Sequence, residues 1–223
     1  MRTAVVGLGA FGTRHAEKCA AEPGCALAAL VEPDAERAAA ASARFGAPAF
    51  ASVDDLPPTI EAATIAAPTT LHGPLGMALL DRGVHVLVEK PIADELAVAE
   101  ALTRRAEARG LVLQVGHVER FSTTFEALRA RVATPLFVEC ERIAPFSGRG
   151  LDVDVLLDLM IHDLDLVAAL VGAPIASIDA VGAPVLSERE DIANARLRFD
   201  DGCVANITAS RISFKTERRI RIF

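Results

Sequence analysis

The sequence predicts an α/β fold in which a doubly wound parallel sheet is followed by an α+β domain with a mostly antiparallel open sheet. Short apolar stretches alternate with helical patterns through residues 1–120, as expected for parallel strands joined by crossover helices. After residue 120, stretches with period-two alternation follow one another closely, which is typical of antiparallel strands. We therefore expect two domains, at residues 1–120 and 121–223.

In the first domain, the expected strands are runs of small and β-branched apolar residues, and two of the expected helices stop at Gly46 and Gly110. We expect strands at 3–7, 26–31, 49–50, 62–66, 85–89 and 111–115, a helix that begins within residues 7–12, helices at 33–45, 73–82 and 93–109, and a helical turn and loop at 52–58.

In the second domain, the strands are recognised by alternation and by a hairpin turn, Asp200-Asp-Gly202. We expect helices at 123–132 and 153–170, a loop at 147–150, and strands at 135–144, 174–184, 192–199, 203–213 and 216–223. The last of these strands stops without a turn or cap, so we expect a chain that is truncated at its C-terminus.

Composition excludes several classes of protein. A net charge of −7 with no basic run argues against a nucleic-acid surface, and no apolar run reaches membrane-spanning length. The four cysteines have no metal-binding spacing, so we expect buried free thiols in a reducing compartment. The first strand begins at once, which leaves no room for a signal peptide and favours a cytoplasmic location.

A glycine-rich turn, Gly7-Leu-Gly9-Ala10-Phe11-Gly12, follows the first strand, and Glu32 ends the second. In a dinucleotide site, such glycines allow a tight turn, close approach of a pyrophosphate and close helix–strand contact. The helix N-terminus favours the phosphates, and an acid twenty residues after the last glycine accepts hydrogen bonds from the ribose. The alternative is a glycine-rich turn that serves only for packing, but this would not explain why an acidic residue, Glu32, ends the second strand.

The acid also bears on the choice of cofactor. A carboxylate at Glu32 would repel a 2′-phosphate, and Arg37 is the only nearby cation that could compensate. We therefore expect NAD, with NADP less favoured.

Polar clusters follow several strands of the parallel sheet, at the edge where such sheets bind ligands. They are Glu32, Thr69 to His72, Glu89-Lys90-Pro91 and His117 to Arg120. Lys90 could donate a hydrogen bond to a substrate hydroxyl or exchange a proton. The alternative is a lysine paired with Glu89 at the rim of the sheet.

The helix expected at 153–170 is apolar nearly all round, apart from Asp158, His162 and Asp165 at i, i+4 and i+7. Buried acids and imidazoles need partners, so His162 is a candidate base that Asp158 orients or charges. The alternative is a solvated helix edge. The spacing of His72, His117 and His162 does not support a metal site, and we expect none.

These motifs together resemble the Gfo/Idh/MocA family of glucose–fructose oxidoreductase and inositol 2-dehydrogenase. The resemblance rests on the glycine-rich turn, Ala67-Pro68, Glu89-Lys90-Pro91, and Asp158 with His162, and it covers essentially the whole chain. It implies a Rossmann domain, an open sheet used in homo-oligomer contacts, and hydride transfer between a nicotinamide cofactor and a sugar or cyclitol carbon.

The resemblance also assigns roles to residues. Lys90, Asp158 and His162 look like the catalytic set, and His117 and Arg120 like substrate-binding residues. The cofactor would contact Gly7, Gly9, Ala10, Phe11, Gly12, Glu32, Ala67, Pro68, Thr69, His72, Glu89 and Lys90. Ala67 departs from the family, which usually has threonine there.

Two segments, 115–121 and 158–165, look most like a subgroup that includes UDP-N-acetylglucosamine 3-dehydrogenase. The substrate implied is a nucleotide sugar. Two alternatives stay open: an inositol or other polyol dehydrogenase of the same family, and an NAD-binding sensor without turnover.

Overall fold

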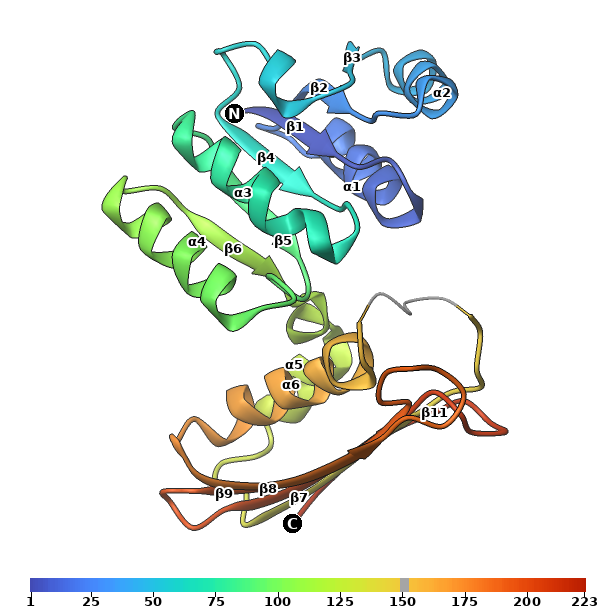
Figure 1. Cartoon of the computed structure of the whole chain (residues 1–223). Coiled ribbons are helices and arrows are strands. Elements are labelled where there is room, and N and C mark those ends of the chain that lie inside the picture. Colours follow the sequence, from blue (N-terminus) through green and yellow to red (C-terminus); the bar gives the residue numbers. More distant parts are fainter. Residues whose placement is uncertain (149–152) are drawn as a thin grey trace. The chain divides into compact units, whose positions relative to one another are not determined.

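The computed structural model describes residues 1–148 and 153–223. These residues form two compact units, Met1–Gly116 and His117–Phe223. Each unit has its own sheet and its own buried core (Figure 1). The loop expected at 147–150 lies partly outside the described residues.

The sheet of the first unit has six strands, all parallel, in the order β3-β2-β1-β4-β5-β6. This order reverses between β1 and β4, as in a doubly wound nucleotide-binding fold, and confirms the predicted Rossmann sheet. The strands are β1 (Arg2–Val6), β2 (Ala26–Val31), β3 (Ala49–Phe50), β4 (Ala62–Ile65), β5 (His85–Glu89) and β6 (Leu113–Gly116).

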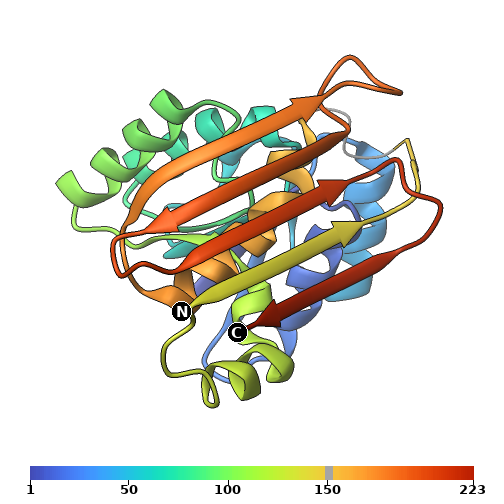
Figure 2. The ribbon, with the colours of Figure 1, turned by 90° about the horizontal axis from the view of Figure 1, so that it is seen from below.

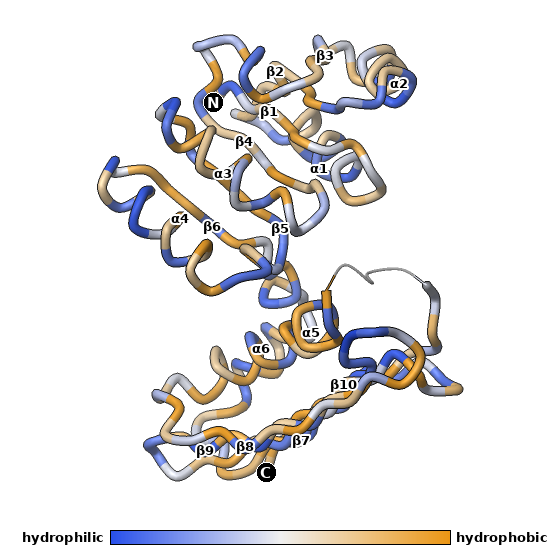
Figure 3. The backbone as a smooth tube through the Cα atoms, viewed as in Figure 1, coloured by the Kyte–Doolittle hydropathy of each residue, from blue (hydrophilic) through white to orange (hydrophobic). Residues whose placement is uncertain are grey.

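Helices cover both faces of this sheet because successive strand residues point to opposite sides. Val6 belongs to the core formed with α3 (His72–Asp81) and α4 (Leu96–Ala108). Val5 belongs to the core formed with α1 (Ala10–Ala21) and α2 (Ala35–Phe45). Figure 3 shows hydrophilic residues on the outer helices α2 and α4.

The sheet of the second unit has five strands in the order β11-β7-β10-β9-β8. Adjacent strands of this sheet are antiparallel, except for the parallel pair β7 and β10. This confirms the prediction of a mostly antiparallel sheet. The strands are β7 (Phe137–Ile143), β8 (Ile175–Ala183), β9 (Ile192–Phe199), β10 (Val204–Ser210) and β11 (Glu217–Ile222). The turn at 200–202 joins β9 to β10, with Gly202 at φ 90°.

One face of this second sheet is covered by α6 (Ile161–Val171) and the other is open (Figure 2). Ala195 and Leu197 point toward the helix and are buried with Met160 and Val167. Residues between them on β9, such as Arg196, point to the open face.

The long helix expected at 153–170 is not a uniform α-helix. Leu156–Met160 forms a π-helical turn, and the α-helix proper runs from Ile161 to Val171. Because a π-turn holds more residues than an α-turn, Asp158 and His162 are not related by the regular α-helical spacing that the sequence pattern assumed. The helix expected at 123–132 is also shorter than predicted: it is α5 (Thr123–Arg129).

The thiols differ from one another in burial. All four cysteines are free, and Cys140 and Cys203 are buried as expected. Cys19 and Cys25 are only half-buried, because they lie at the end of α1 and just before β2. Within the described residues, no helix is long and apolar enough to cross a bilayer.

The glycine-rich turn has a steric requirement that we can test. Gly7 has φ 84°, and a Cβ placed on Gly12 would lie 1.7 Å from the Gly7 carbonyl oxygen. We expect Gly12→Ala to destabilise the first unit by about 3 kcal/mol or more, since the backbone must move. Urea denaturation followed by circular dichroism measures this. Gly9→Ala is the matched control, because a Cβ there meets nothing within 4 Å; equal stability of the two variants would contradict the argument.

Candidate active site

The glycine-rich turn leaves space at the N-terminus of α1. Gly9 is the N-cap residue, and the first turn of the helix carries no acidic side chain. The open space at Gly9 therefore faces backbone N–H groups and the positive end of the helix dipole. This arrangement fits the pyrophosphate of a dinucleotide.

Glu32 directly follows β2, where the sequence predicts the ribose-binding acid. Its carboxylate also accepts hydrogen bonds from other residues of the chain. The side chain is 5% exposed and accepts hydrogen bonds from Leu8 N (2.9 Å), Asp34 N (3.1 Å) and Arg37 Nη2 (3.0 Å). Burial alone would raise the pKa of Glu32, but the bonds from Arg37 and the two amides outweigh it and lower the pKa. Glu32 therefore stays ionised and anchors the glycine-rich turn.

The segment that follows β4 is held by a buried histidine. His72 is 1% exposed; its Nδ1 lies 2.8 Å from Pro91 O and its Nε2 2.9 Å from Ala67 O. Both ring nitrogens face backbone carbonyls, so the ring ties the 67–72 segment to the residue after Lys90. Thr69 opens the intervening 3-10 turn (Thr69–Leu71) and is its one buried residue.

Glu89 is the last residue of β5, Lys90 follows it, and the Lys90–Pro91 peptide is cis. Glu89 Oε1 accepts a hydrogen bond from His15 Nε2 at 2.6 Å, which links the end of β5 to α1. Burial raises the pKa of Glu89, but His15 and the Lys90 amide outweigh that effect and lower it. A Cβ on Gly116 would come within 3.2 Å of the Glu89 carboxylate, so β6 also confines this side chain.

In the second unit, Arg142 of β7 bridges two carboxylates. It is 5% exposed, and its guanidinium bonds Asp163 through Nε (3.0 Å) and Nη2 (2.9 Å). It also bonds Glu119 through Nη1 (3.0 Å) and Nη2 (2.6 Å). Burial would lower the pKa of Arg142, but the two acids raise it. The bridge connects the 3-10 turn Val118–Phe121 to the start of α6.

His162 lies beside this bridge. Its Nδ1 is 3.7 Å from Glu119 Oε1, and Arg218 Nη1 is 3.7 Å from the same oxygen. Burial would raise the pKa of Glu119, but Arg142, His162 and Arg218 lower it. Burial raises the pKa of Asp163 in spite of Arg142, and the nearby Glu119 adds to the rise.

Asp165, the third member of the predicted polar stripe, pairs with the segment after β6. Arg120 donates to it through Nε (2.6 Å) and Nη2 (2.5 Å), and His117 Nδ1 lies 3.8 Å away. The stripe is therefore not a solvated helix edge at this position. Arg120 and His117, which the resemblance implies are substrate-binding, lie on the same side of α6.

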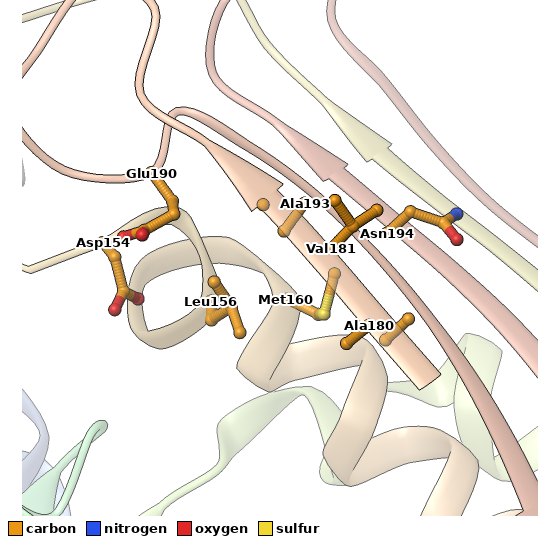
Figure 4. A pocket seen from close by; sticks show the side chains of 10 residues that line it. Asp154, Leu156, Met160, Ala180, Val181, Glu190, Ala193 and Asn194 are labelled. Atoms are coloured by element: carbon orange, nitrogen blue, oxygen red, sulfur yellow. The ribbon is translucent and has the colours of Figure 1, made fainter. Parts of the chain in front are cut away.

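A pocket in the second unit lies elsewhere, between the π-helical turn and strands β8 and β9 (Figure 4). Leu156, Met160 and Val181 form its apolar wall, and Asp154 and Glu190 lie together at one end. Its lining includes none of the predicted catalytic residues. We assign it no role.

The predicted site residues thus gather in two sets. The first unit brings together the glycine-rich turn, Glu32 and the Lys90 segment. The second brings His117 and Arg120, at the 3-10 turn Val118–Phe121, together with the part of α6 that carries His162 and Asp165. Sequence reasoning gave no role to three residues that join the second set: Arg142 and Asp163, and Glu119 within the polar cluster His117 to Arg120. The available signal was Arg142, since alternation along β7 places it on the buried face with Val138 and Cys140.

The two units each match a known protein-family model. Residues 1–117 match GFO_IDH_MocA, an oxidoreductase family with an NAD-binding Rossmann fold, and residues 123–223 match the GFO/IDH/MocA C-terminal domain. The chain belongs to the Gfo/Idh/MocA family. Like its relatives in that family, it is a nicotinamide-dependent dehydrogenase acting on CH–OH groups.

Several relatives within the Gfo/Idh/MocA family carry names of sugar and inositol dehydrogenases. UDP-N-acetylglucosamine 3-dehydrogenase from Acidithiobacillus ferrooxidans is 42% identical, over 100% of this chain and 71% of its own. A solved structure of that name matches with a TM-score of 0.93, covering 100% of this chain and 74% of its own. The scyllo-inositol 2-dehydrogenase (NAD(+)) of Bacillus subtilis is 27% identical, over 96% of this chain and 68% of its own.

Proposed function

We propose that this protein is an NAD-dependent dehydrogenase that oxidises the C3 hydroxyl of a nucleotide sugar such as UDP-N-acetylglucosamine, or runs the reverse reaction. The observation that carries the proposal is the 42% identity, over the whole chain, to an enzyme of that name. The glycine-rich turn with Glu32, and His162 backed by a carboxylate, supply the chemistry that such a reaction needs.

The first unit would bind the cofactor. Gly7, Gly9, Ala10, Phe11 and Gly12 would hold the pyrophosphate. Glu32 keeps a carboxylate at the ribose, and segments Ala67 to His72 and Glu89-Lys90 line the remainder of the site. When bound, the nicotinamide supplies the acceptor or donor of the hydride.

The second unit would handle the proton. In the oxidation direction, neutral His162 accepts the proton of the sugar hydroxyl. Lys90 is the proposed hydrogen-bond donor to the substrate. Asp158 stabilises the imidazolium that results. His117 and Arg120, oriented by Asp165, contact the substrate. The protein's contribution is then orientation and proton transfer.

A second candidate substrate is inositol or another free polyol. Its support is the set of inositol dehydrogenases among the relatives, of which one from Leifsonia xyli is 33% identical over 89% of this chain. The two candidates require the same proton transfer, so only the substrate pocket separates them.

The catalytic assignment predicts that His162→Ala lowers kcat by about a hundredfold or more while the Kd for NAD changes little. NADH formation at 340 nm, measured with UDP-N-acetylglucosamine, other nucleotide sugars and inositols, gives both the substrate and the rate. Calorimetric titration with NAD is the control for binding. Full activity of His162→Ala, or turnover of polyols alone, would overturn the corresponding part of the proposal.

The cofactor assignment predicts a preference for NAD that depends on Glu32. We expect Glu32→Gln to reduce the ratio of kcat/KM for NAD over NADP at least tenfold, that is by about 1.4 kcal/mol, because it removes the repulsion of a 2′-phosphate and releases Arg37. In Arg37→Ala, which keeps the carboxylate, the preference for NAD should persist. A wild-type enzyme that prefers NADP would refute this assignment.

We also propose a homo-oligomer formed through the open face of the second sheet. That face carries polar ladders, such as Arg196 Nη1 to Asn206 Oδ1 at 3.0 Å and Asn194 Nδ2 to Thr208 Oγ1 at 2.8 Å. We expect the wild type to sediment as a dimer or tetramer at micromolar concentration and Arg196→Glu to dissociate it, because the reversed charge disrupts a self-complementary face. A monomeric wild type in the ultracentrifuge would contradict this.

A further inference from the structure

Glu119 is a carboxylate outside the predicted catalytic set that faces the candidate base. Arg142 holds both of its oxygens, at 3.0 and 2.6 Å, so the carboxylate cannot turn away from its present direction without breaking a bidentate pair. The oxygen nearer His162 is Oε1, 3.7 Å from Nδ1. The side chain of Glu119 is only 27% exposed and that of His162 only 16%, which limits the screening of their interaction by water.

We propose that Glu119 is a positioning residue for His162: it holds the imidazole by its Nδ1 edge and favours the protonated ring, so that Nε2 is the nitrogen that exchanges the proton with the substrate. This proposal rests on the proposed function, in which His162 is the base. It gives a role to a residue for which the sequence pattern assigned none, on a different element from Asp158.

The charge balance around Arg142 supports this role. One guanidinium neutralises two carboxylates only in part, so Glu119 and Asp163 together leave one negative charge. Asp163 is 4% exposed and is held by Arg142 through Nε and Nη2, whereas Glu119 Oε1 lies 3.7 Å from His162 Nδ1. The residual negative charge therefore favours a proton on His162.

The distance indicates when the interaction matters. At 3.7 Å the contact between Glu119 Oε1 and His162 Nδ1 is too long for a hydrogen bond, so Glu119 attracts a neutral His162 only weakly. Once the ring is protonated, Nδ1–H is a charged donor, and a small shift brings it to hydrogen-bond distance of Oε1. The interaction thus strengthens as the substrate loses its proton, and strengthening of this kind accelerates a reaction.

Other charged groups contribute to the field at His162. They are Arg218 on β11, Arg142 on β7, His117 and Arg120 around the 3-10 turn, and Asp158, Asp163 and Asp165 on the helical segment. Arg218 opposes Glu119, because its Nη1 lies 3.7 Å from the same oxygen. Its side chain is 68% exposed, so solvent weakens its effect.

The test measures the His162 imidazole by NMR titration of the full chain, independently of activity. We expect Glu119→Gln to lower its pKa by about one unit, because the neutral amide no longer stabilises the imidazolium. His162 must be neutral to act as base in the oxidation direction, so the acid limb of kcat/KM should move to lower pH by the same amount. The plateau should also fall, since the base is weaker.

Three further variants make the test specific. Glu119→Asp keeps the charge and should retain most of the wild-type titration. Arg218→Gln should shift the pKa of His162 slightly upward, opposite to Glu119→Gln, and its exposed position leaves folding intact even if Glu119→Gln fails to fold. Glu141→Gln is the matched control, because Glu141 lies next to Arg142 in β7 but pairs with Arg219.

The outcomes separate this proposal from the proposed function. An unchanged His162 titration in Glu119→Gln and Arg218→Gln overturns the positioning role, whatever the activity. A shifted titration supports that role. If the titration shifts while the acid limb of kcat/KM does not, the positioning role stands and His162 is not the base.

Discussion

Pairing of buried charge is the constraint on which the candidate site depends. Arg142 is 5% exposed and would be costly to bury alone, so it requires the acids that it bridges. These acids come from the turn after β6 and from the first turn of α6. The need to pair the buried Arg142 guanidinium with these acids therefore determines where the turn carrying Glu119 meets the helix carrying His162.

In the first unit, too, buried charges require partners, but there the buried groups are carboxylates. Glu32 and Glu89 are both largely removed from water, and each accepts donors from an element that is distant in sequence. Glu32 takes the Leu8 amide of the glycine-rich turn, and Glu89 takes His15 of α1. The residues expected to contact a cofactor are thus also the residues that hold the turn and the end of β5 in position.

This dual use affects how variants should be interpreted. A substitution at Glu32 removes two backbone hydrogen bonds of the chain as well as the proposed contact to the ribose, so loss of binding and loss of order are mixed. A side chain such as Arg218 is exposed and contributes mainly through its charge. Charge-only changes at such positions therefore report on the chemistry more cleanly than truncations within the buried pairs.

The sequence by itself determined the order of strands and helices, the Rossmann sheet, the glycine-rich turn and the acid that ends β2. These features depend on local periodicity and on residues close in sequence, which a single chain displays directly. Only the tertiary structure decided the π-helical turn at Leu156–Met160 and the bridge from Glu119 through Arg142 to Asp163. The bridge joins residues more than twenty positions apart, and sequence spacing cannot show which buried acid meets which buried cation, because that depends on how the helix packs on the sheet.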